Sequence, residues 1–101
     1  MITRIWHGKT KKSDSKIYRE YVTETGIRDY KSIKGNLGAQ IWQRDEGDIT
    51  HIYTVSWWED YPSIKAFAGE DFEKAKYYEE DKKYLLDFEP TVAHYETFDF
   101  R

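Results

Sequence analysis

The chain has 101 residues, with 16 basic and 19 acidic side chains and a formal net charge of −3. That length predicts a single domain over residues 1–101, because chains usually divide into several domains only when they are longer. The lack of cysteine excludes disulfide bonds, thiolate zinc sites and cysteine nucleophiles. The interspersed charges predict no nucleic-acid partner, since phosphate neutralisation requires clustered cations.

The first 31 residues are predicted to form one strand and one helix. Alternating β-branched and aromatic residues predict a strand over "ITRIWHG" (2–8). Apolar and ring residues then recur every three or four positions, which predicts an amphipathic helix from Ser15 to about Lys31. Ser13 or Asp14 is placed to cap it, and Gly26 predicts a kink or a close packing contact.

Three further strands are expected. "LGAQIWQR" (37–44) and "ITHIYTVSWW" (49–58) flank the acidic, glycine-containing "DEGD", which is suited to a hairpin turn. "TVAHYETFDF" (91–100) alternates again and predicts the last strand.

A second helical region lies before the last strand. Pro62 near its start and Gly69 near its end are typical of helix boundaries. Asp71 is placed to cap a second piece that runs through Tyr78, and "DKKYLLDF" (81–88) predicts a third short turn. The second helix is therefore expected to be broken.

The element order is β-α-β-β-α-β, which indicates an α+β, ferredoxin-like fold with a four-stranded antiparallel sheet and helices on one face. Trp57 and Trp58 must point to opposite faces, since neighbours alternate in a strand. One should pack against the helices and the other should face away from them. A second copy is the simplest cover for the open face, so we expect a homodimer with the sheets packed face to face.

The chain resembles the antibiotic biosynthesis monooxygenase superfamily, whose members are small dimeric α+β-barrel proteins. The likeness extends over nearly the whole chain. The segments that carry it are "RIWHGKT" (4–10), "TGIRDY" (25–30), "GNLGAQIWQR" (35–44), "SWWEDYPSIKAFAGED" (56–71), "AKYYEEDKKYLL" (75–86) and "EPTVAHYE" (89–96).

This resemblance implies a pocket between the sheet and its helices. In the quinone-forming members, oxygen reacts directly with a bound aromatic molecule without a metal or flavin. We therefore expect a cofactor-independent monooxygenase-like protein that binds or oxidises a small aromatic or quinol compound. The aromatic content, 18% of the chain, suits such a pocket. Its expected walls are Trp6, Tyr21, Trp58, Phe67, Tyr77 and Tyr78, each of which could equally be a core ring.

Three residues are candidates for the chemistry. His7 is a candidate base for deprotonating the substrate, and Tyr77 is a candidate neutral hydrogen-bond donor. Arg4 shares a strand side with Trp6. It would hold a phenolate or carboxylate if that side faces the pocket, or form a salt bridge if it faces a partner chain.

Other functions remain open. A non-catalytic dimeric binding or stress-response protein would keep the same rings only as a core. The superfamily also contains haem-degrading enzymes with an Asn, a Trp and a His around the haem. By position, the Asn falls near Trp6 or His7, the Trp near Phe67 and the His near Tyr77. None of the three haem-pocket residues is therefore retained in this sequence.

Metal binding and location complete the expectations. His7, His51 and His94 could gather at one end of the sheet as a zinc site, but no carboxylate pattern such as HExxH supports one, so we expect no metal and no cofactor. The N-terminal "MITRIWHGKT" lacks the apolar core of a signal peptide, and no segment approaches the ~20 apolar residues of a membrane span. We expect a soluble cytoplasmic protein without a membrane partner.

Overall fold

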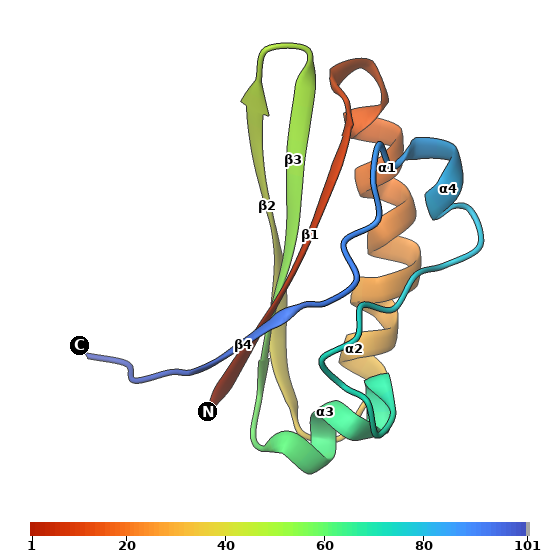
Figure 1. Cartoon of the computed structure of the whole chain (residues 1–101). Helices are drawn as coiled ribbons and strands as arrows, with labels where there is room; N and C mark the ends of the chain where they lie inside the picture. Colours follow the sequence, from red (N-terminus) through yellow and green to blue (C-terminus); the bar gives the residue numbers. More distant parts are fainter. Residues whose placement is uncertain (101) are drawn as a thin grey trace.

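A four-stranded antiparallel sheet with strand order β2-β3-β1-β4 forms the body of the protein (Figure 1). The computed structural model describes residues 1–100. The strands are β1 (Ile2–Lys11), β2 (Asn36–Glu46), β3 (Ile49–Trp58) and β4 (Ala93–Glu96). All helices lie on one face of this sheet, and its other face is open (Figure 1). The predicted ferredoxin-like α+β fold is thus confirmed.

Two strands differ in length from the prediction. β1 does not end at Gly8, because β3 pairs with it as far as Lys11 opposite Ile49. β4 spans four residues instead of the predicted ten. Its pairing with β1 ends at Glu96 opposite Ile2, where β1 itself begins, so the chain beyond has no strand to pair with.

The first helical region is continuous but irregular. It consists of α1 (Ser15–Val22), a π-helical turn (Thr23–Ile27) and α2 (Arg28–Ser32). The predicted irregularity at Gly26 is confirmed, since this residue lies in the π-helical turn. The buried positions 18, 22, 26 and 30 recur every four residues. That spacing drifts by about 40° per step in a regular α-helix, and the wider π turn offsets part of the drift.

The predicted cap of this helix is wrong. The side chain of Asp14 makes no capping hydrogen bond, and a short 3-10 turn, Lys12–Asp14, leads into α1 instead.

The helix α3 (Tyr61–Ala68) has the predicted boundaries. Asp60 precedes it, and its carboxyl oxygen Oδ1 accepts a 3.0 Å hydrogen bond from the backbone N–H of Ser63. Pro62 occupies its first turn and Gly69 follows its end. The positions of Pro62 and Gly69 are those that the sequence indicated, and the cap by Asp60 adds to them.

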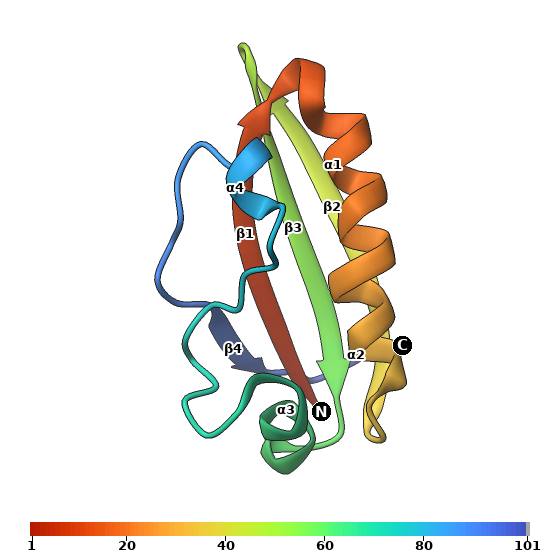
Figure 2. The same ribbon diagram turned by 90° about the vertical axis from the view of Figure 1, so that its right-hand side faces the viewer.

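Residues 69–92, here called the strap, cross the edge of the sheet beside β1 (Figure 2). The predicted helix through Tyr78 is wrong, and the strap contains only one short helix, α4 (Asp81–Tyr84). Several of its backbone hydrogen bonds join positions that are far apart in the sequence. Ala75 N–H donates to the carbonyl of Pro90 and Leu86 N–H donates to the carbonyl of Lys9, each at 2.9 Å.

The sheet separates two environments. Toward the helices, one group of buried residues surrounds Trp6 and Tyr18, and a second surrounds Tyr30, Trp58 and Phe67. Trp58 is fully buried there, whereas Trp57 lies on the open face, as its neighbouring position predicts. Within residues 1–100, no helix is long and apolar enough to cross a membrane.

Candidate functional site

A small hollow lies on the helix side of the sheet, and its lining residues come from three parts of the chain. The sheet supplies its floor, α1, the π turn and α2 supply one wall, and the strap supplies the other. Its volume is about 20 Å³, room for about one water molecule. The residues that matter for its chemistry are Trp6, Tyr18, Tyr30, Thr54, Tyr78 and Asp81.

Asp81 is the acidic group of this hollow. It is the first residue of α4, and only 3% of its surface is exposed. One carboxyl oxygen accepts a hydrogen bond from the Tyr18 hydroxyl at 2.8 Å, and the other accepts one from the Tyr78 N–H at 2.5 Å. Burial nevertheless raises the pKa of Asp81, because removal from water penalises the carboxylate more than these two bonds favour it.

The aromatic hydroxyls around the hollow are all held by partners. Tyr30 Oη lies 3.0 Å from Thr54 Oγ1, and Tyr78 donates to Asp29 at 2.6 Å. Burial raises the pKa of Tyr18, Tyr30 and Tyr78. These phenols are therefore neutral donors at neutral pH.

Arg4 is buried behind Tyr30, with 1% of its surface exposed. Its Nη1 group donates to the carbonyl of Phe72 at 2.6 Å and to Nε2 of His94 at 2.9 Å. None of the ion pairs found within residues 1–100 includes Arg4. The positive charge of Arg4 is thus held by hydrogen bonds to neutral groups. This charge lowers the pKa of Tyr30, but burial raises the same pKa by more.

His94 must be neutral in this arrangement. Its Nε2 atom accepts the hydrogen bond from Arg4, so its proton is on Nδ1. The pKa of His94 is lowered to about 4, mainly by burial and to a smaller extent by the positive charge of Arg4.

The expected wall residues all lie on the helix side, but they do not surround one cavity. Trp6 and Tyr78 line the hollow, and Tyr21 and Tyr77 pack against the group around Trp6. Trp58 and Phe67 belong to the second group, where Tyr30 fills the space beside them with ring centroids 6.0 and 4.7 Å away. Tyr77 donates to the carbonyl of Glu89 at 2.5 Å.

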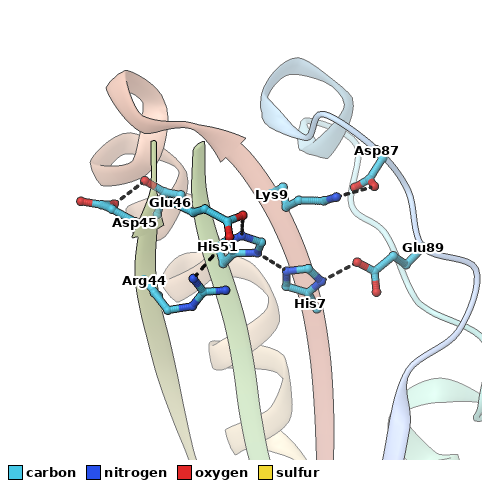
Figure 3. Close-up of polar contacts among 9 residues, drawn as sticks. His7, Lys9, Arg44, Asp45, Glu46, His51, Asp87 and Glu89 are labelled. Atoms are coloured by element: carbon cyan, nitrogen blue, oxygen red, sulfur yellow. Dashed lines mark hydrogen bonds and ion pairs between the residues drawn. The ribbon is translucent and has the colours of Figure 1, made fainter. Parts of the chain in front are cut away.

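The three histidines do not meet. His7 and His51 lie side by side on the open face, with His7 Nε2 2.8 Å from His51 Nδ1 (Figure 3). His94 lies on the helix side, because it pairs with Arg4 in the sheet. Among residues 1–100, no group of three or more His, Cys, Asp or Glu side chains is placed to hold a metal ion. His7 also lies across the sheet from the hollow, since it follows Trp6 in the strand.

The sequence interpretation missed Asp81, Tyr18, Tyr30 and Thr54 as site residues. Asp81 stands in the charged run "EEDKKY", which by itself predicts a solvated helix surface. Tyr18 and Tyr30 share the periodicity of core residues. Only the crossing of the strap over β1 brings these groups together.

Comparisons with known proteins agree with the architecture. No protein-family model matches the sequence, and no curated protein sequence matches it. The structure is similar to a solved structure described as "Putative antibiotic biosynthesis monooxygenase from Nitrosomonas europaea". The match has a TM-score of 0.64 and 13% sequence identity, and it covers 98% of this chain and 100% of that one. The chain therefore has the ferredoxin-like fold of the antibiotic biosynthesis monooxygenases.

Proposed function

We propose that the chain binds a small, flat phenol or quinol in the hollow beside Asp81 and oxidises it with molecular oxygen, as a cofactor-independent monooxygenase. The observation that carries this proposal is a buried carboxyl group among aromatic rings, with a pKa raised by burial. Such a carboxylate is a stronger base than an exposed one, which suits it to remove a proton from the ligand.

The proposed reaction needs only the ligand, the base and dioxygen. Asp81 removes a proton, and the resulting carbanion forms a carbon–oxygen bond with O₂. The peroxide that results takes up a proton and loses water, which leaves a carbonyl group. For anthrone, one CH₂ group and one O₂ give one C=O group and one water. The protein binds the ligand, stabilises its anion and excludes water.

The other candidate residues take supporting roles in this proposal. Trp6, Tyr78 and Tyr18 provide aromatic walls, while Tyr77 packs against Trp6 and Tyr21 packs against Tyr18. Arg4 favours an anionic ligand through a positive charge that is not neutralised by an ion pair. We assign the base to Asp81 and not to His7, because His7 lies on the opposite face of the sheet.

The hollow must enlarge to accept a ring. An engineered cavity that binds benzene measures ~150 Å³, whereas this hollow measures about 20 Å³. The strap is the wall that can move, since most of it is irregular and its longest regular element is the short helix α4 (Asp81–Tyr84). Outward movement of residues 76–80 would open the hollow while the sheet, α1 and the contact between Tyr18 and Asp81 stay in place.

Oxygen consumption with anthrone tests this proposal. The wild-type chain should consume one O₂ per anthrone and form anthraquinone faster than the uncatalysed background. Asp81→Asn should abolish the acceleration. Asp87→Asn is the matched control. It makes the same chemical change on the same strap, but Asp87 forms an ion pair with Lys9 outside the hollow.

The tight packing supports a second candidate, a non-catalytic dimeric binding or stress-response protein. In that case the rings of the hollow are core, and anthrone should neither bind saturably nor be oxidised. The same experiment thus separates the two candidates.

We further propose that the open face pairs with a second copy of the chain. Apolar side chains are exposed on this side of the sheet, including Leu37 (53%), Trp42 (49%) and Tyr95 (55%). The chain beyond β4 leaves the sheet on the same side (Figure 1) and carries the exposed rings of Phe98 and Phe100. Exposed apolar patches of this kind are typical of protein interfaces.

A further inference from the structure

An unbroken run of polar contacts crosses the open face from the strap to the end of β2 (Figure 3). Glu89 Oε2 lies 2.5 Å from His7 Nδ1, and His7 Nε2 lies 2.8 Å from His51 Nδ1. His51 Nε2 lies 3.0 Å from Glu46 Oε1. All four ring nitrogens therefore face another nitrogen or a carboxylate oxygen. We call these four residues the carboxylate–histidine chain.

Counting protons shows what this chain requires. Each of its three contacts is a hydrogen bond only if it holds one proton. Two neutral imidazoles carry two protons, so one contact would then bring two lone pairs together. Two imidazolium rings carry four, so N–H would face N–H between His7 and His51. Three protons satisfy every contact and give the histidine pair one shared positive charge.

The surroundings favour this three-proton state. The side chains of His7 and His51 are 21% and 11% exposed, so little water is available to complete a broken contact. The hydrogen bond from His51 lowers the pKa of Glu46 and keeps it an acceptor. The other titratable or charged groups that face the carboxylate–histidine chain are Lys9 from β1, Arg44 from β2, Tyr53 from β3 and Asp87 from the strap.

We propose that the carboxylate–histidine chain is a proton-binding site within the interface between two copies of the protein, and that the open faces pair most tightly when it holds three protons. This inference rests on the proposed homodimer. In a free protein, the limited water that reaches these side chains, mainly at Glu89 (39% exposed) and Glu46 (65% exposed), can partly replace a contact that a change of protonation breaks. In the pair, the second copy excludes that water, and the broken contact stays unsatisfied.

The sign of the pH dependence follows from this difference. At high pH the free chain loses the third proton more easily than the pair does, so pairing takes up a proton and weakens as pH rises. At low pH the free chain gains the fourth proton more easily, so pairing weakens as pH falls. The dissociation constant should pass through a minimum and rise by up to about tenfold per pH unit for each proton linked on either side.

Sedimentation equilibrium of the wild-type chain between pH 5 and pH 9.5 tests the coupling. The expected result is a minimum in the dissociation constant. His51→Asn should remove most of this dependence, because an amide can donate to a neutral His7 and needs no third proton. Lys9→Gln removes a neighbouring charge that does not belong to the carboxylate–histidine chain, so this variant should keep the minimum. A flat profile of the wild-type pair, or an equal minimum in His51→Asn, would overturn the proposal.

Nitrogen-15 NMR of the imidazole groups in the wild-type protein tests the proton count without any variant. Three of the four ring nitrogens of His7 and His51 should carry protons in the pH range of tightest pairing. A count of two would refute the three-proton state even if two copies of the protein pair. A chain that stays monomeric at every pH would refute the homodimer and the coupling with it, whatever the count.

Discussion

The hydroxyl group of Tyr18 donates a 2.8 Å hydrogen bond to the carboxyl group of Asp81, joining α1 to the strap across 63 positions of sequence. Both residues are buried. This contact fixes the position of the one acidic group that lines the hollow, and it links the stability of the strap to the chemistry proposed for it.

Tyr18→Phe should destabilise the fold by about 1–3 kcal/mol, because it leaves a buried carboxyl oxygen without its donor. Tyr84→Phe is the matched control, since the Tyr84 ring packs against Tyr18 with centroids 5.7 Å apart but makes no hydrogen bond to Asp81. Urea unfolding at pH 7 measures both changes. Equal losses in the two variants would show that the bond to Asp81 contributes nothing.

The fold should lose stability in acid through His94. Its folded pKa of about 4 lies below the ordinary value of ~6.5, so the unfolded chain binds a proton that the folded chain excludes between these values. Stability is therefore complete above about pH 6.5 and falls toward pH 4, by about 2 kcal/mol after allowance for partial exposure. His94→Gln keeps an acceptor for Arg4 and should reduce the pH dependence of urea unfolding by one proton in this range. An unchanged slope would contradict the neutral His94.

Trp42→Glu should dissociate the proposed pair. Trp42 is 49% exposed on the open face, and a carboxylate there would be buried without a partner by the second copy. Ile17→Glu is the control, because Ile17 is similarly exposed (52%) but lies on α1. Sedimentation velocity should give a mass near twice 12.2 kDa for the wild type and Ile17→Glu, and a monomer for Trp42→Glu. A monomeric wild type would contradict the pairing.

Gly26→Ala should stabilise the fold by about 0.5–1 kcal/mol, because Ala loses less conformational entropy in a helix. An added Cβ would meet its nearest atoms, on Tyr30 and Tyr78, at 3.9 Å, which is ordinary contact. The methyl group would also occupy part of the hollow that Gly26 lines. Thermal unfolding measures the stability gain, and a lower melting temperature would show that the π turn requires glycine.

The sequence predicts the sheet well because its strands obey local rules. The strand predicted at 49–58 from its β-branched and aromatic residues has the same bounds as β3, and Asp60 and Pro62 set the start of α3. The strap is different. Its backbone bonds join Ala75 to Pro90 and Leu86 to Lys9, and no local pattern reports such pairs, so residues up to Tyr78 were expected to be helical.

The site is harder to predict than the fold for the same reason. His7 and His51 meet because the register places His51 opposite Lys9 and Tyr53 opposite His7, and a shift of β3 by one residue would move His51 to the other face. Asp81 becomes a buried acid only when the strap crosses the sheet. Aromatic residues could be assigned to the helix side as a class, but their division into two groups depends on Tyr30, whose position follows from the π turn.

Titration of the wild-type chain with anthrone under nitrogen, followed by tryptophan fluorescence, tests the central claim most directly. Trp6 lines the hollow, so its emission should change with saturable binding of one anthrone per chain. Gly26→Ala should weaken this binding while it stabilises the fold, and Asp87→Asn should leave it unchanged. No saturable change in the wild type, or equal binding by the more stable Gly26→Ala chain, would show that the hollow is only part of a closed core.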